Sequence, residues 1–351
     1  MVWSRRAILV LLSAATPLLS GCQIGYLVSS AYHQVGLLNS RVPIEEALKN
    51  PSLTEEQRRK LRLALEAHRF AENNLGLHHS KSYTTYTQLD RPYVTYVVSA
   101  APKDELTAYK WWFPVVGSLP YKGYFNPDRA KEEADEMKAK GFDTSVRGVS
   151  AYSTLGWFSD PILSSMLRYK DYELVNTVIH ETVHATIYIK SEADFNERLA
   201  VFIGNQGTEE FYRLREGAES PTLAQIANNT VDEKLFSDFI FREMKNLEEW
   251  YAQNKSKPDF LQTRPARLKE IQQRFVTELK PHFKEKESYG RFESSELNNA
   301  TLLTYRLYFE NLGDFEAVFN KLGRDFHKMV EFCKTLESAK DPKKALADAG
   351  H

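Results

Sequence analysis

The stretch Leu174-Val-Asn-Thr-Val-Ile-His-Glu-Thr-Val-His-Ala-Thr-Ile187 contains the strongest structural signal in the chain. Its apolar residues recur at intervals of three and four, which predicts a helix over residues 171–190 with one face in the core. Residues i and i+4 share a helix face, so His180 and His184 can direct both imidazoles at one ion. Neutral imidazole is a preferred zinc ligand, and Glu181 is placed to take a proton from water. The alternative is two histidines on a partly buried helix beside a surface glutamate.

A catalytic zinc needs a third protein ligand. Glu197 lies 13 residues after His184, at the start of the next expected helix, Phe195 to Gly204. Two helices joined by a short turn face each other, so Glu197 would come back towards the histidines. The competing hypothesis is a capping box, in which Glu197 bonds the backbone N–H of Asp194.

A metzincin site does not fit, because Ile187 and Lys190 stand where that pattern needs a glycine and a third histidine. The other histidines are weaker ligand candidates. They lie after a helix end or within helical segments, where surface or packing roles are commoner: His33, His68, His78, His79, His282 and His327.

The remaining elements predict an α+β fold. Helices are expected at 43–50, after the capping box Thr54-Glu-Glu-Gln57, at 127–140, from Ser159, and over most of the chain after Thr222. Strands are expected at 93–98, 110–116, 119–125 and 142–152. We expect one domain over residues 22–351, with a small antiparallel or mixed sheet and the histidine helix in an N-terminal lobe (about 22–190) and a mostly helical C-terminal lobe (about 191–351).

The first 21 residues predict a lipoprotein signal peptide. Arg5 and Arg6 precede an apolar run from Ala7 to Leu19, and Ser20-Gly21 precede Cys22. The run is short for a membrane span, and small residues before a cysteine are typical of a lipobox. We therefore expect Cys22 to be lipidated and to anchor the chain to a membrane of the cell envelope, facing the periplasm; an ordinary cleaved signal is the alternative. Gln23 after the anchor favours the outer membrane.

Composition excludes other classes. The chain has 351 residues and a net charge of −1, so no basic field predicts a nucleic-acid partner. Cys333 is the one cysteine besides Cys22, so the mature domain is expected to have no internal disulfide. Oligomeric state is not readable from the sequence.

These residues resemble the bacterial putative aminopeptidases, which are described as zinc-dependent lipoproteins with a gluzincin-like site. The likeness runs from about Tyr26 to Phe332. It is carried by the H-E-x-x-H and by these stretches: 69–71 (RFA), 114–125 (PVVGSLPYKGYF), 151–161 (AYSTLGWFSDP), 195–197 (FNE) and 297–300 (LNNA). The resemblance implies a zincin-like fold, His180, His184 and Glu197 as zinc ligands and Glu181 as base. The family carries cysteines near Trp112 and Ser118, and this chain has none there.

Substrate contacts are open to hypothesis. In zincin-like enzymes an edge strand holds the peptide in extended form, and residues 146–152 have a suitable composition; an interior strand is the alternative. Tyr152 and Tyr305 are candidates to stabilise the oxyanion. An aminopeptidase also needs an acidic group for the substrate's ammonium. Glu209 and Glu210 follow the ligand helix, although surface charge is the commoner role.

We therefore expect a zinc metallopeptidase, in first place an aminopeptidase, that acts on peptide substrates with Glu181 as base. An endopeptidase is one alternative. A non-catalytic zinc-binding or scaffold lipoprotein is another, and hydrolysis of a non-peptide amide is a third. Dependence on Glu181 separates the enzyme from the binding protein, because a binding protein does not need a base.

Overall fold

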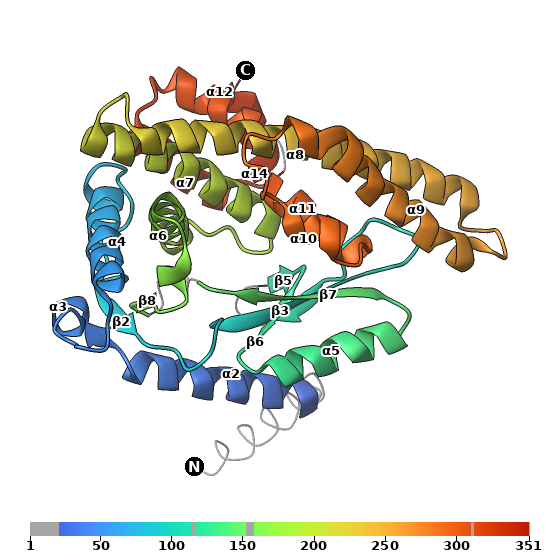
Figure 1. Ribbon diagram of the computed structural model, residues 1–351, viewed down its shortest axis with the longest axis horizontal. Helices are drawn as coiled ribbons and strands as arrows, with labels where there is room; N and C mark the ends of the chain where they lie inside the picture. The colour runs from blue at the N-terminus through green and yellow to red at the C-terminus, as the bar shows by residue number, and fades with distance from the viewer. Residues whose placement is uncertain (1–20, 114–116, 152–157, 310–311, 351) are drawn as a thin grey trace, which may run out of the picture. The chain divides into compact units, whose positions relative to one another are not determined.

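The computed structural model describes residues 21–113, 117–151, 158–309 and 312–350 (Figure 1). The chain divides into two compact units, Met1–Arg41 and Val42–His351. In the first unit the structure describes α2 (Gly21–Asn39). All elements discussed below belong to the second unit.

A three-stranded antiparallel sheet lies at the centre of the second unit. β3 (Thr95–Ala101) pairs with β6 (Lys122–Tyr124) on one side and with β7 (Asp143–Val149) on the other. α5 (Pro127–Ala139) packs on one face of this sheet, and α11 (Asn299–Phe309) contacts β3 and β7 from the other (Figure 1). In the described residues β7 is therefore an edge strand of this sheet, as hypothesised for residues 146–152, and the alternative of an interior strand is wrong.

Two smaller sheets make up the rest of the β structure in the described residues. β2 (Thr85–Thr87) pairs antiparallel with β1 (Val42–Pro43) and parallel with β8 (Ile162–Leu163). β4 (Trp111–Phe113) pairs antiparallel with β5 (Gly117–Leu119). The helix expected from Ser159 is wrong, because this segment supplies β8 and then a single 3-10 turn, Met166–Arg168.

Three helices surround the candidate site. α6 (Asp171–Thr186) packs between α4 (Glu55–Asn73) and α7 (Ala193–Glu216). The predicted capping box at the start of α4 is confirmed, since Thr54 Oγ1 accepts from Gln57 N and Gln57 Oε1 accepts from Thr54 N. A single turn, α3 (Ile44–Ala47), precedes α4.

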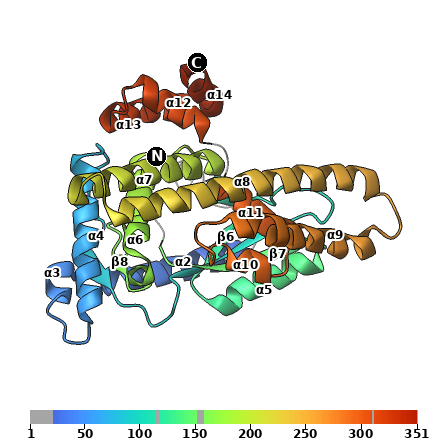
Figure 2. The same ribbon diagram turned by 45° about the horizontal axis from the view of Figure 1, so that its top comes forward.

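The chain after residue 216 is helical throughout its described elements, as predicted. Long helices α8 (Pro221–Asn254) and α9 (Phe260–Arg274) lead into a π-helical turn, Phe275–Leu279, a 3-10 turn, Lys280–His282, and the short α10 (Gly290–Ser294). Buried aromatic rings of Phe236, Phe239, Phe275 and Phe292 hold these helices together. α12 (Gly313–Lys321), α13 (Phe326–Thr335), a 3-10 turn, Leu336–Ser338, and α14 (Pro342–Gly350) end the chain beside α7 (Figure 2).

The fold is therefore α+β with small sheets, as the sequence predicts. In the part of the chain that the structure describes, no helix is both long and apolar enough to cross a membrane.

Candidate metal centre

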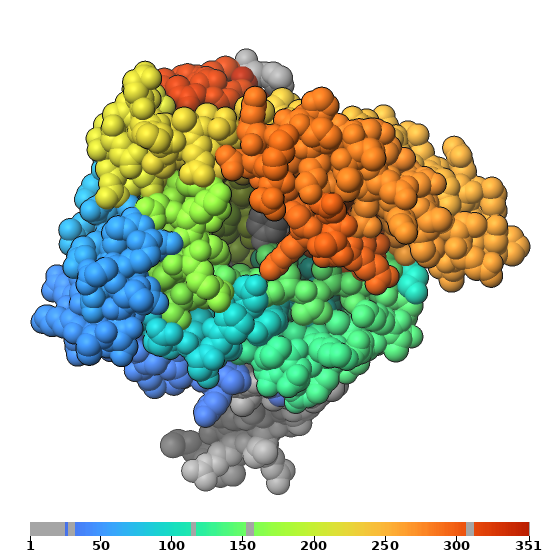
Figure 3. Space-filling view, in the orientation of Figure 1, coloured from blue at the N-terminus to red at the C-terminus, as the bar shows by residue number. Residues whose placement is uncertain are grey.

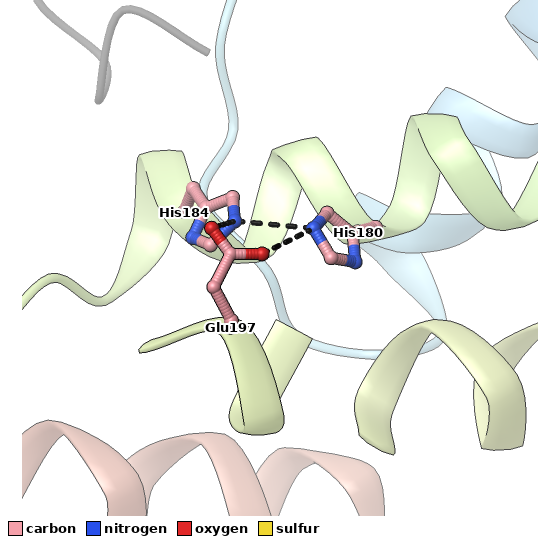
Figure 4. A group of neighbouring side chains, drawn as sticks. All are labelled: His180, His184 and Glu197. Carbon is pink, nitrogen blue, oxygen red and sulfur yellow. Dashed lines mark hydrogen bonds and ion pairs between the residues drawn. The ribbon is translucent and has the colours of Figure 1, made fainter. Parts of the chain in front are cut away.

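Two histidines of α6 and one glutamate of α7 converge on a single point. The Nε2 atoms of His180 and His184 are 3.1 Å apart. Glu197 Oε2 lies 3.6 Å from His180 Nε2, and its Oε1 lies 3.7 Å from His184 Nε2 (Figure 4). In the described residues these are the three whose donor atoms could share one ion, and all three atoms lie within 4.8 Å of one another. The predicted positions are thus brought together.

The donor set fits zinc in number, type and spacing. Zinc prefers imidazole nitrogen and carboxylate oxygen at about 2.0–2.2 Å in tetrahedral geometry, which places neighbouring donors about 3.3 Å apart. The two imidazole nitrogens are 3.1 Å apart, and each lies within 3.7 Å of a different oxygen of the Glu197 carboxylate, which is close to that value. Three protein donors also leave a fourth position open, as catalytic rather than structural zinc requires.

The electrostatics of the cluster are set by one carboxylate between two imidazoles. Burial raises the pKa of Glu197, but His184 and His180 outweigh this and hold the pKa well below its usual value. Burial lowers the pKa of His184, and the neighbouring Glu197 more than reverses that effect. Glu197 is therefore an ionised carboxylate, the form that binds a cation.

Asn196 fixes where Glu197 sits. Its side chain makes two hydrogen bonds with the backbone of Ile189: Nδ2 donates to the carbonyl at 2.7 Å, and Oδ1 accepts from the N–H at 2.9 Å. Asn196 and Ile189 are both buried. These bonds tie the loop after α6 to the first turn of α7. They therefore fix the position of Glu197 on α7 relative to His184 on α6.

A close backbone approach supports the same loop. Ser191 has a φ of 65°, and a Cβ on Gly117 would lie 2.1 Å from the Ser191 Oγ. Gly117 itself has a φ of 82°, which favours glycine. Glycine at residue 117 therefore suits both this left-handed backbone conformation and the close approach of the Ser191 side chain from the α6–α7 loop.

The capping hypothesis for Glu197 is wrong. α7 begins at Ala193 rather than after Asp194, no side chain caps it, and Glu197 faces the histidines (Figure 4). Asp194 is an exposed residue of the first turn.

Glu181 is not one of the three converging donors, although it lies next to them on α6. Burial raises the pKa of Glu181, and His180 and His184 act in the opposite direction. Glu181 therefore lies within electrostatic reach of the cluster without being part of it, which is the placement expected of a base.

The structure does not place either predicted tyrosine at the metal centre. Tyr152 lies outside the described residues. Tyr305 on α11 packs against Phe236 and Phe292 in the aromatic core.

Sequence reasoning missed two other tyrosines. Burial raises the pKa of Tyr169, with a further contribution from Glu181. Burial likewise raises the pKa of Tyr188, with a contribution from Glu197. Tyr169 follows the turn that precedes α6 and Tyr188 follows α6 itself. No pattern among 18 tyrosines marks these two, because their proximity arises from how the chain enters and leaves one helix.

Several predicted residues lie elsewhere. Glu209 is 12 residues after Glu197 on the same helix, a distance of about 18 Å at 1.5 Å per residue. Glu209 and Glu210 are therefore too far away to hold the ammonium of a substrate cleaved at the cluster. Cys22 is the second residue of α2, and Cys333 is a free, buried thiol as expected.

Comparison with known proteins gives one match. The sequence model of a family described as "Putative aminopeptidase" matches residues 25–347. No curated protein and no solved structure matches the chain.

Proposed function

The chain belongs to the Putative aminopeptidase family, and from this premise we propose that it is a zinc-dependent peptidase with Glu181 as its general base. The convergence of His180, His184 and Glu197 within 4.8 Å is the observation that carries the proposal. Family membership supports peptidase activity, and the donor set supports zinc.

Each residue has a defined task in this proposal. Zinc, when bound, acts as a Lewis acid that makes water a nucleophile near neutral pH and polarises the scissile carbonyl. His180, His184 and Glu197 hold the ion. Glu181 takes a proton from the attacking water and passes it to the leaving amine. Asn196 keeps the ligand helix in register.

Tyr169 and Tyr188 are the proposed sources of a hydroxyl that stabilises the developing oxyanion. They replace Tyr305 in this role because their surroundings include Glu181 and Glu197. Removing one such donor costs about 10²–10³ in kcat. Tyr169→Phe and Tyr188→Phe should therefore include at least one variant with that loss and unchanged zinc content. A loss confined to Tyr305→Phe would contradict the assignment.

Localisation belongs to the same proposal. We propose that residues 1–21 are removed and that lipid on Cys22 holds the enzyme at the envelope membrane, facing the periplasm. The support is the order of a basic start, a short apolar run and a small pair before cysteine.

The central test compares peptide hydrolysis by wild type, Glu181→Gln and Glu210→Gln. Glu210 is on α7, 13 residues beyond Glu197, so the same exchange there is a matched control. We expect about one zinc per chain in all three proteins. Glu181→Gln should lose hydrolysis by a factor of at least about 10³, since it removes the base and keeps the ligands.

Two outcomes would contradict the proposal. Full activity in Glu181→Gln excludes this residue as base. Zinc binding without hydrolysis of any peptide in a mixed library favours the non-catalytic zinc protein instead. Products from the library also separate stepwise removal of N-terminal residues from internal cleavage.

A further inference from the structure

The last three helices of the chain pack on one another. α12 contacts both α13 and α14, and all three helices contribute buried side chains, which include Phe315, Phe319, Met329, Cys333 and Leu346. In Figure 3 the red atoms of this segment lie at one edge of the molecular surface. We refer to residues 313–350 as the C-terminal helices.

The C-terminal helices pack against the helix that carries Glu197. Phe195, Arg198 and Phe202 recur on α7 at intervals of three and four, and all three contact α12. The Phe315 ring of α12 has its centroid 5.4 Å from that of Phe195 and 5.7 Å from that of Phe202. Glu197 instead faces the histidines of α6 (Figure 4). The start of α7 therefore lies between α6 and α12.

A buried ion pair lies within this contact. Arg198 follows Glu197 directly in the sequence and is 7% exposed. Its Nη2 donates to both carboxylate oxygens of Asp314, at 2.6 and 2.7 Å, and its guanidinium lies 5.2 Å from the centroid of the Phe315 ring. Asp314 is in the first turn of α12, where a helix N-terminus stabilises negative charge. Removing either partner would leave the other charge without its counter-ion.

Two further contacts join the C-terminal helices to the loop before α7. Glu337 Oε1 accepts from the backbone N–H of Tyr188 at 3.1 Å. Lys343 Nζ lies 3.9 Å from a carboxylate oxygen of Glu192 and 3.9 Å from one of Asp194. The side chain of Lys343 is half exposed, and ion pairs in such positions contribute little. The buried ion pair is therefore the stronger link.

We propose that the C-terminal helices position Glu197 for zinc binding, with Arg198 and Asp314 as the positioning pair. Arg198 is the next residue on the same helix, so holding its side chain limits rotation of α7 about its axis and sets the direction of Glu197. This deepens the proposed function, on which it rests, by naming what governs metal affinity. Coupling between two sites is reciprocal, so zinc must also stabilise the C-terminal helices against opening.

The first measurement is the zinc affinity of the full chain, by competition with a chelator. Groups that orient metal ligands contribute about 10–100-fold to affinity. We therefore expect Arg198→Ala and Asp314→Asn each to bind zinc about tenfold more weakly. The double variant should bind no more weakly than either single variant, because one interaction is lost in all three. Asp314→Asn keeps the side-chain size, so it tests the pair even if Arg198→Ala does not fold.

A conservative variant and a matched control separate positioning from general stability. Arg198→Lys keeps the charge and should bind zinc more tightly than Arg198→Ala. The buried carboxylate of Glu243 accepts from two nitrogen atoms of Arg274, at the end of α9. Arg274→Ala and Glu243→Gln break this comparable pair. They should lower the free energy of unfolding and leave zinc affinity unchanged.

Hydrogen exchange measures the reciprocal effect without any hydrolysis. In wild type, added zinc should slow the exchange of backbone amides in α12, α13 and α14, because it makes local opening of these helices less frequent. Asp314→Asn should reduce this protection. Amides of α9 should exchange at the same rate with and without zinc in both proteins.

Three results would overturn the proposal. Zinc affinity equal to wild type in both Arg198→Ala and Asp314→Asn would show that the pair does not position Glu197. An equal loss of affinity in the control pair would show that affinity follows stability. Exchange in the C-terminal helices that zinc does not change would remove the coupling. If wild type binds zinc and hydrolyses peptides in these cases, the peptidase proposal stands; if wild type binds no zinc, both proposals fail.

Discussion

Asn196 is the residue whose role is best defined by geometry, because both of its polar atoms bond one buried backbone unit. Asn196→Ala leaves the N–H and carbonyl of Ile189 without these partners. A buried unsatisfied group costs about 1–3 kcal/mol, so we expect the free energy of unfolding to fall by about 3 kcal/mol and zinc affinity to fall with it.

Asn205→Ala is the matched control. Asn205 is on the same helix and accepts one hydrogen bond from Asn176 in a half-buried position. Its loss should cost about 1 kcal/mol and leave zinc affinity unchanged. Denaturant unfolding and a zinc titration measure both quantities. Unaltered zinc affinity in Asn196→Ala would show that the loop does not position Glu197.

Sequence reasoning reached the cluster residue by residue. His180 and His184 follow from helix periodicity alone, and Glu197 follows from the length of the turn. The role of Asn196 does not follow from the sequence, because its partner is a backbone unit seven residues away and backbone partners leave no mark on side-chain patterns. Tyr169 and Tyr188 do not follow from the sequence either, because their interaction with Glu181 and Glu197 depends on how the chain folds around α6.

At the scale of elements, the sequence predicts features that depend on neighbouring residues, such as a helix cap, and misses features that depend on contacts between distant parts of the chain. The capping box of α4 was predicted to the residue. α7 was expected to end at Gly204 and instead continues to Glu216. Its glycines allow close packing: a Cβ on Gly207 would lie 2.7 Å from Leu75 Cδ1. β8 was read as a helix because its pairing with β2 joins residues about 76 apart in sequence.

Pairing of β4 with β5 gives a prediction about the two positions at which the family resemblance implies cysteines. Trp112 and Ser118 are register partners across this pair of strands. Facing residues of an antiparallel pair have Cα atoms about 4.5–5.5 Å apart, within the range of a disulfide. Trp112→Cys with Ser118→Cys should therefore form a bond on oxidation and stabilise the chain by about 2 kcal/mol, as expected for a short closed loop.

Mass spectrometry and thermal melting with and without reductant test this hairpin. Trp112→Ser, with the native Ser118 kept, is the control for loss of the indole. Free thiols after oxidation, or a melting temperature that reductant does not change, would show that the two positions do not meet in solution.

Glu133 on α5 is expected to make the free energy of unfolding depend on pH. Burial raises its pKa, but hydrogen bonds from Lys122, Tyr124 and Trp111 outweigh burial and lower it overall. A carboxylate with a lowered folded pKa stabilises the fold above its ordinary pKa of 4.5, and that stability is lost as pH falls through the folded value.

We expect Glu133→Gln to lower the free energy of unfolding by about 1–2 kcal/mol at pH 7. The difference from wild type should shrink as pH is lowered from about 5 towards 3. Unfolding curves across this range measure it. A difference that stays constant with pH would mean that the Glu133 charge is not what stabilises the sheet against α5.

At the scale of the whole molecule, anchoring depends on one residue. Lipid on Cys22 should place the chain in the membrane fraction, and Cys22→Ser should release the exported chain, because there is no polybasic segment beside Cys22 to hold it. Cell fractionation with radiolabelled fatty acid tests both points. Membrane association of Cys22→Ser, or absence of label in wild type, would contradict lipid anchoring.

X-ray absorption at the zinc edge of the purified chain tests the proposed zinc site directly. We expect about one zinc, held by nitrogen and oxygen at about 2.0–2.1 Å with imidazole scattering, and loss of the metal in Glu197→Ala. Absence of stoichiometric zinc, or a sulfur shell at about 2.3 Å, would contradict the assignment of His180, His184 and Glu197 as its ligands.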